Sequence, residues 1–155
     1  MKRITYGADE WVVVNEPEET TVRSRRRLLA LMTTCAHAMQ EVERARDAEV
    51  AKLGLPDGVE PSDEQLRQAM IKSNPDISED EADRLLQLEQ AAMVATIRDW
   101  SRPEEISRDT FDNMAVPVYE ELSRAVATER AALMAQLQVD FEPTPSVDPG
   151  NPTGA

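Results

Sequence analysis

The single cysteine and the single histidine of this chain lie two positions apart, at Cys35 and His37. A thiol and an imidazole held together could form a nucleophilic pair or supply two ligands to a metal ion. On a helix, however, residues two apart point about 200° away from each other, so these side chains cannot share a ligand. We therefore interpret Cys35 as a small core residue and His37 as a residue of the polar face, and we expect no metal.

The acidic segment DISED, residues 76–80, resembles the start of a calcium-binding loop, because oxygen-bearing side chains stand at its first, third and fifth positions. Such a loop needs Gly at its sixth position and a bidentate Glu at its twelfth. The chain has Glu81 and Gln87 there. The same acids suit the first turn of a helix, where negative charge interacts favourably with the helix dipole. We adopt that interpretation and expect no cofactor.

Catalytic motifs are the third possibility. The chain has 30 acidic residues, so neighbouring carboxylates occur by number alone and do not indicate acid–base catalysis. The sequence contains no GxSxG, GxxxxGK[ST], GxGxxG or HExxH motif, and it has five Gly and one His. It therefore predicts a protein that is not an enzyme.

One basic cluster, formed by Arg23, Arg25, Arg26 and Arg27, stands at the start of a predicted helix. Positive charge there opposes the helix dipole, which suggests a role for these side chains. Guanidinium groups could bind nucleic-acid phosphates, but the net charge of −13 would repel a nucleic acid. We favour ion pairs with acidic groups, either of this chain or of a partner protein.

Six methionines besides the initiator fall mostly on predicted helix faces, where a core position is the simplest interpretation. Flexible thioethers also suit a groove that accepts varied helices. Acidic, methionine-rich helices without a catalytic motif indicate protein–protein binding, with a basic or amphipathic helix as the favoured partner. The candidate partner-binding residues are Arg23, Arg25, Arg26, Arg27, Met32, Met39 and Trp100.

These residues must be positioned mainly by helices. A helical pattern runs over about residues 21–53, with apolar residues that step by four and three positions. They are Leu28, Met32, Cys35, Met39 and Val42. The next steps fall on Arg46 and Glu49, so this apolar seam breaks in the last third of the helix. Gly54 suits the position just after the helix.

Three further helices are predicted by their start signals. Ser62 and Ser78 each open a capping box, with Gln or Glu three residues later. Pro117 suits the first turn of the last helix, where its missing N–H costs nothing. The expected bounds are 63–73, 79–100 and 117–138.

β-branched and aromatic runs on either side of Gly7 predict a β-hairpin over residues 3–14. At the other end, residues 142–155 are rich in Pro and predict a flexible tail. The fold class we expect is therefore mainly α: a small helical bundle with an N-terminal β-hairpin, in one domain over residues 1–141.

Charge and hydropathy narrow the class of protein further. Residues 1–53 are neutral in sum, so the whole net charge of −13 lies in residues 54–155. That balance argues against binding to duplex DNA or to an anionic membrane. The N-terminus lacks the apolar run of a secretory signal, and the longest uncharged stretch is too short and polar to span a bilayer. We expect an intracellular protein.

Three segments resemble small tail-morphogenesis proteins of long-tailed, siphovirus-like phages that infect GC-rich bacteria. The first is ITYGADEWVV at residues 4–13, and the second is the apolar helix that ends at Trp100. The third is VPVYEEL at residues 116–122. Within that group, the chain most resembles the tail assembly chaperones.

The resemblance implies an acidic, mostly helical protein of the host cytoplasm. Tail assembly chaperones bind the long tape-measure protein, keep its hydrophobic helices soluble and deliver it to the tail-tube subunits, and a homo-oligomer is compatible with that role. Two alternatives stay open. One is a structural virion component, such as a head–tail adaptor or minor tail protein. The other is an acidic DNA mimic that inhibits a nucleic-acid-binding enzyme.

Overall fold

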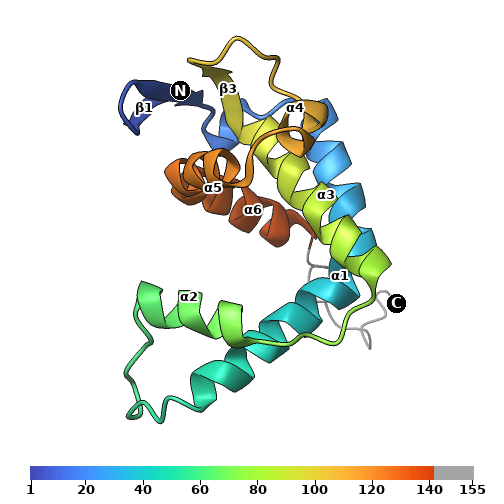
Figure 1. Cartoon of the computed structure of the whole chain (residues 1–155). Helices are drawn as coiled ribbons and strands as arrows, with labels where there is room; N and C mark the ends of the chain where they lie inside the picture. Colours follow the sequence, from blue (N-terminus) through green and yellow to red (C-terminus); the bar gives the residue numbers. More distant parts are fainter. Residues whose placement is uncertain (142–155) are drawn as a thin grey trace, which may run out of the picture. The chain divides into compact units, whose positions relative to one another are not determined.

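The computed structural model describes residues 1–141, which are mainly helical with an N-terminal antiparallel sheet (Figure 1). The elements are, in chain order, β1 (Lys2–Tyr6), β2 (Glu10–Val14), the 3-10 helix η1 (Pro17–Glu19), α1 (Val22–Ala51), α2 (Asp63–Lys72), α3 (Glu79–Thr96), β3 (Ile97–Trp100), α4 (Arg108–Asp112), α5 (Val116–Ala125) and α6 (Ala127–Phe141). The expected mainly α fold class is confirmed, with a three-stranded sheet where a two-stranded hairpin was expected. The predicted tail at 142–155 lies outside the described residues.

Residue contacts divide the chain into two compact units. Unit 1 contains residues 1–30 and the described chain from Glu89 onward, and unit 2 contains Leu31–Leu88. Helices α1 and α3 each continue from one unit into the other. The expectation of one mostly helical domain over residues 1–141 stays a prediction.

Local start and stop signals act as the sequence predicts. The Oγ of Ser62 accepts a hydrogen bond from Gln65 N at 3.2 Å, while Ser62 N donates to Gln65 Oε1 at 2.8 Å. Ser78 forms the same reciprocal pair with Glu81 at the start of α3. Gly54 follows α1 with a φ of +64°, a conformation that L residues rarely adopt. The helices predicted at 21–53 and 63–73 are thus confirmed as α1 and α2.

The hairpin expected over residues 3–14 is confirmed as β1 and β2, which pair antiparallel with Ile4 opposite Val12. A third strand pairs with β2, however, and it comes from the last residues of the helix predicted at 79–100. Helix α3 ends at Thr96, and Ile97–Trp100 form β3. Asn15 binds the end of α3, where the chain changes from helix to strand. Its backbone N–H donates to Thr96 O at 2.8 Å, and its side chain donates to Ala95 O at 3.1 Å.

A β-bulge explains why this strand has the apolar spacing of a helix. Ile97 and Trp100 are three residues apart, so in a regular strand they would face opposite sides of the sheet. Here Trp100 lies opposite Val12 and Ile97 opposite Val14, with a register shift between them. The extra residue lets both side chains enter the same core, where they are 3% and 5% exposed.

The helix predicted at 117–138 is also corrected, because the chain forms two helices, α5 and α6. They are separated at Val126, whose φ of −104° and ψ of 9° leave the α-helical region. Pro and Gly are absent around this position, so the sequence carries no local signal for the break. Val126 is fully buried in the core of unit 1, and this packing overrides the helical pattern.

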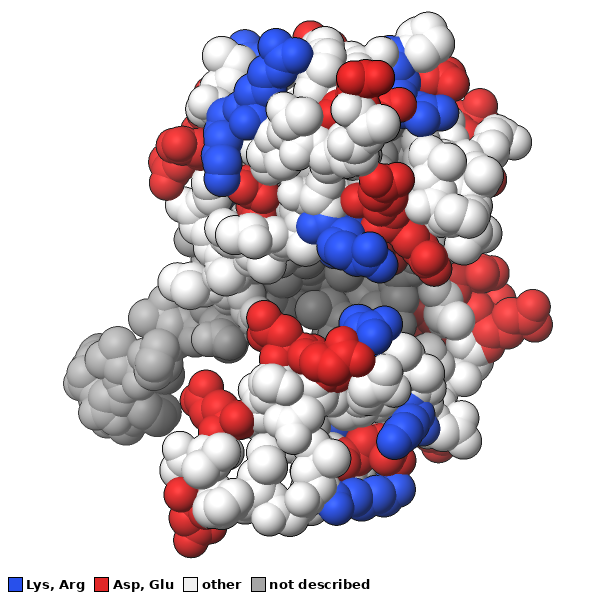
Figure 2. Space-filling view, turned by 60° about the vertical axis from the view of Figure 1, so that its left-hand side comes forward, with Lys and Arg blue, Asp and Glu red and all other residues white. Residues whose placement is uncertain are grey.

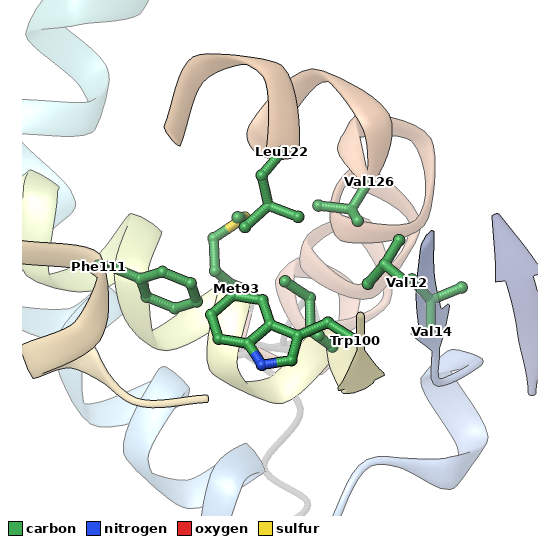
Figure 3. Close-up of a cluster of buried hydrophobic side chains, with 8 residues drawn as sticks. Val12, Val14, Met93, Trp100, Phe111, Leu122 and Val126 are labelled. Atoms are coloured by element: carbon green, nitrogen blue, oxygen red, sulfur yellow. The ribbon is translucent and has the colours of Figure 1, made fainter. Parts of the chain in front are cut away.

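The core of unit 1 gathers side chains from the sheet and from α3, α4 and α5 (Figure 3). Its buried members are Val12, Val14, Met93, Ile97, Trp100, Phe111, Leu122 and Val126. The rings of Trp100 and Phe111 meet edge to face, with their centroids 5.9 Å apart. The indole N–H of Trp100 donates to Glu104 O at 2.8 Å, so its polar atom is paired despite burial.

Replacing Leu122 by Ala should test this core. Leu122 is fully buried, so the Leu122→Ala variant should lose about 2–5 kcal/mol of unfolding free energy, measured by urea denaturation. Val116→Ala is the control in the same helix, because Val116 is 67% exposed and its truncation should change stability by less than about 0.5 kcal/mol. Equal, small losses in both variants would contradict the packing described here.

Candidate functional site: a cleft between α1 and α2

The candidate partner-binding residues occupy different environments. Arg23, Arg26 and Arg27 are exposed in the first turns of α1, whereas Arg25 and Met39 are half-buried. Met32 is 2% exposed and Trp100 is 5% exposed. These two side chains belong to the interior, where burial of their apolar surface stabilises the fold, so the structure removes them from a partner-binding surface.

Cys35 and His37 lie where the sequence predicts. The thiol of Cys35 is fully buried, and the His37 side chain is exposed on the opposite side of α1. Among residues 1–141, no group of three His, Cys, Asp or Glu side chains is arranged to hold a metal ion. In the same part of the chain, no helix has the length and apolarity that crossing a bilayer requires.

Unit 2 contains an open cleft of about 430 Å³ between the end of α1 and helix α2. Its lining consists of Glu49, Lys52, Leu53, Glu64, Gln65, Gln68, Ala69 and Lys72. Leu53 and Ala69 provide the apolar surface, together with the methylene groups of the longer side chains. Leu53 is 45% exposed, so a bulky apolar group is open to solvent at the cleft.

The cleft is open because the facing helices do not fill it. Helix α2 buries a single residue, Ala69, whose methyl group occupies little volume. On α1 the apolar seam has already ended, with Arg46 and Glu49 at the positions where apolar residues would continue it. This break was visible in the sequence, and it is the signal that could have located the cleft. Leu53 and Ala69 themselves carry no local signal for binding.

Most charges around the cleft are paired. Lys52 Nζ lies 2.7 Å from Glu49 Oε1, and Arg67 lies 2.8 Å from Glu64 Oε1. Hydrogen bonds from Arg67 and Gln68 lower the pKa of Glu64 to about 2, so its carboxylate stays ionised. Unit 2 as a whole has six basic and thirteen acidic residues, a net charge of −7. The cleft is thus an apolar hollow in an acidic unit.

Two carboxylates tie the start of α3 and the segment before it to α1. Glu81 Oε2 lies 2.7 Å from His37 Nδ1, and Glu41 Oε1 accepts a hydrogen bond from Asp76 N at 3.1 Å. Arg44 also donates to both oxygens of Glu41, and the pKa of Glu41 is lowered to about 2 mainly by these bonds. These contacts anchor to α1 the chain that follows α2 and the first turn of α3.

A second hollow, of about 310 Å³, lies in unit 1 beside the start of α5. Arg102, Glu104, Asp109 and Asn113 form much of its lining. Its lining is more polar than that of the cleft in unit 2.

Comparison with known proteins adds no assignment: no protein-family model, no curated protein and no solved structure matches this chain.

The His37–Glu81 contact should make stability depend on pH. The hydrogen bond and charge of Glu81 raise the pKa of His37 above its usual 6.5 and lower the pKa of Glu81. The stabilisation is therefore fully present below pH 6.5 and is lost as pH rises through the raised pKa of His37. The difference in unfolding free energy between wild type and His37→Gln should shrink over that rise.

Glu81→Gln is the matched variant, because Gln preserves the capping box with Ser78 but removes the charge. It should lose the same pH-dependent part of stability as His37→Gln. Parallel stability profiles for all three proteins between about pH 5.5 and 8, where histidine titrates, would contradict the contact.

Proposed function

We propose that this chain is a non-enzymatic tail assembly chaperone of a long-tailed phage, and that it binds a helical segment of the tape-measure protein during tail assembly. The observation that carries the proposal is the cleft between α1 and α2, where Leu53 is exposed beside the small side chain of Ala69. Apolar surface left open to water in this way is stabilised when a partner covers it.

The shape and charge of unit 2 favour one kind of client. A cleft along two helices accepts the apolar face of a third helix, which inserts side chains at helical spacing. The net charge of −7 on unit 2 attracts a client with basic residues beside that apolar face and speeds the encounter. An amphipathic helix with basic flanks therefore fits the cleft best.

The resemblance to tail assembly chaperones supports the choice of client. Its segments include residues 4–13 and Trp100, which form two strands and part of the core of unit 1. These residues build the fold and leave the cleft of unit 2 to bind. A chaperone needs this separation, because its client must be released while the chaperone stays folded.

The charges visible on one face of the protein do not have the pattern expected of a DNA mimic. Such a protein needs its acids along one extended face, in imitation of a phosphate backbone. On the face shown in Figure 2, Lys and Arg side chains lie among the Asp and Glu side chains, with uncharged surface between the groups. A structural virion component is tested separately, by mass spectrometry of purified particles, from which a chaperone should be absent.

Charge placed in the cleft should abolish client binding. When a tape-measure protein is co-expressed with the wild type, a soluble complex should be recovered by pull-down, and Leu53→Glu should reduce its yield at least about tenfold, because a desolvated carboxylate opposes apolar contact. Leu86→Glu is the matched control: Leu86 is also a leucine of unit 2 and also 45% exposed, but it does not line the cleft.

Both substitutions are at partly exposed positions, so both variants should stay folded by circular dichroism. Equal losses of complex would assign the effect to general charge and remove the cleft from the proposal. An insoluble client with the wild-type protein, and no complex, would overturn the chaperone function itself.

A further inference from the structure

A tight turn in the connection between α1 and α2 places a carboxylate directly before a glycine. Asp57 and Gly58 are both exposed, and a hydrogen bond from Val59 N to Pro56 O, 3.0 Å long, closes the turn. Gly58 has a φ of +81°, which type II turns require at their third residue. Glycine adopts this conformation without a steric penalty, so the pair suits the turn.

The same pair holds an electrophilic carbon beside a nucleophilic nitrogen. A bond between Asp57 Cγ and Gly58 N would close a five-membered ring. Within residues 1–141, neither the N–H of Gly58 nor the carboxylate of Asp57 has a hydrogen-bond or ion-pair partner. Apart from its chain neighbours, no atom lies within 4 Å of the position that a Cβ of Gly58 would occupy. The nitrogen is therefore unshielded, and the ring has room to form.

Another exposed Asp provides a comparison within the chain. Asp57 is the only Asp in the sequence that Gly follows. Asp76 is also exposed and also lies outside the helices, but the next residue, Ile77, has a β-branched side chain. Ile77 N also donates to Pro75 O at 3.0 Å. The nitrogen after Asp76 is thus both shielded and hydrogen-bonded, whereas the nitrogen after Asp57 is neither.

We propose that Asp57 is a site of spontaneous isoaspartate formation in the folded protein. Gly58 N attacks Asp57 Cγ, a C–N bond forms, the N–H proton is lost and one carboxyl oxygen leaves as water. Water then opens the resulting succinimide. When it attacks the original main-chain carbonyl of Asp57, the bond from that carbon to Gly58 N breaks, and the chain stays linked through Cγ with the α-carboxylate free. One water leaves and one is added, so the chain keeps its mass and its charge.

The folded turn offers little protection against this reaction. Its closing hydrogen bond joins two exposed residues, Pro56 and Val59, and such exposed turns open at low free energy. Isoaspartate adds one methylene group to the main chain, so the original turn cannot form again after the reaction. The modification therefore alters the connection between the two helices that line the cleft. The inference does not depend on the proposed chaperone function.

Incubation of the full chain in warm, mildly acidic buffer tests the proposal. Peptides from timed samples are separated and weighed by mass spectrometry, because the succinimide has lost one water and the isoaspartyl peptide has the parent mass but a different retention time. Methyl transfer from S-adenosylmethionine by a protein-isoaspartate methyltransferase identifies the new carboxylate. Isoaspartate should form at Asp57 at least about tenfold faster than at Asp76, because glycine leaves its nitrogen unshielded.

The same incubation in guanidinium chloride measures what the fold contributes. Unfolding frees the backbone around every Asp, so the rate at Asp57 in the unfolded chain reports the reactivity of the Asp-Gly pair alone. The rate at Asp57 in the folded protein should lie within about tenfold of that value, because the turn is exposed and opens readily.

Two variants assign the reaction to this pair of residues. Asp57→Glu should abolish it, since the longer side chain would have to close a six-membered ring. Gly58→Asn should slow it at least about threefold, because Asn tolerates a positive φ but carries a side chain beside the nitrogen. Both positions are exposed, so both variants should stay folded by circular dichroism.

Three outcomes would overturn the proposal. The first is an equal rate at Asp57 and Asp76 in the folded protein. The second is protection of Asp57 by more than about tenfold relative to the unfolded chain, which would show that the fold holds the turn closed. The third is isoaspartate formation in this peptide of the Asp57→Glu variant at the wild-type rate, which would place the reaction at another residue.

Discussion

The pairing of Ile97–Trp100 with β2 is the constraint on which unit 1 depends. A two-stranded hairpin is marginal in water, and a third strand gives it a face that can be buried. The bulge in this pairing turns Ile97 and Trp100 toward the same core, where the Trp100 ring contacts Phe111 from α4. Because β3 follows α3 directly, the same few residues end a helix, complete a sheet and supply the largest side chain of the core.

Unit 2 is stabilised in a different way. Helix α2 buries only Ala69, and the chain after it is held to α1 by hydrogen bonds and charges at Glu41 and Glu81. Exposed polar contacts stabilise a fold less than buried apolar surface does. Regions with few buried contacts open at lower free energy than packed cores, and binding surfaces are drawn from such regions. The thin packing that leaves Leu53 exposed is therefore consistent with a site that receives a partner.

Sequence reasoning succeeded where structure is decided locally. The capping boxes at Ser62 and Ser78 and the stop at Gly54 depend on residues within one turn, so they can be recognised without the rest of the fold. The strand at 97–100 and the break at Val126 depend on residues distant in sequence, and the local patterns there indicated a helix. Trp100 was expected at a partner-binding surface for the same reason, since its burial follows from a strand that the sequence did not predict.

The charged residues also divide into those with a local structural role and those without one. Several acids of residues 54–155 have local roles, as when Glu81 caps α3 and Glu64 pairs with Arg67. Those roles offset part of the cost of so much negative charge. Charges without such roles contribute more to what the surface attracts, because a paired charge has little attraction left for a partner. The arrangement of the unpaired groups, in addition to the net charge of −13, therefore governs the electrostatic field around this protein.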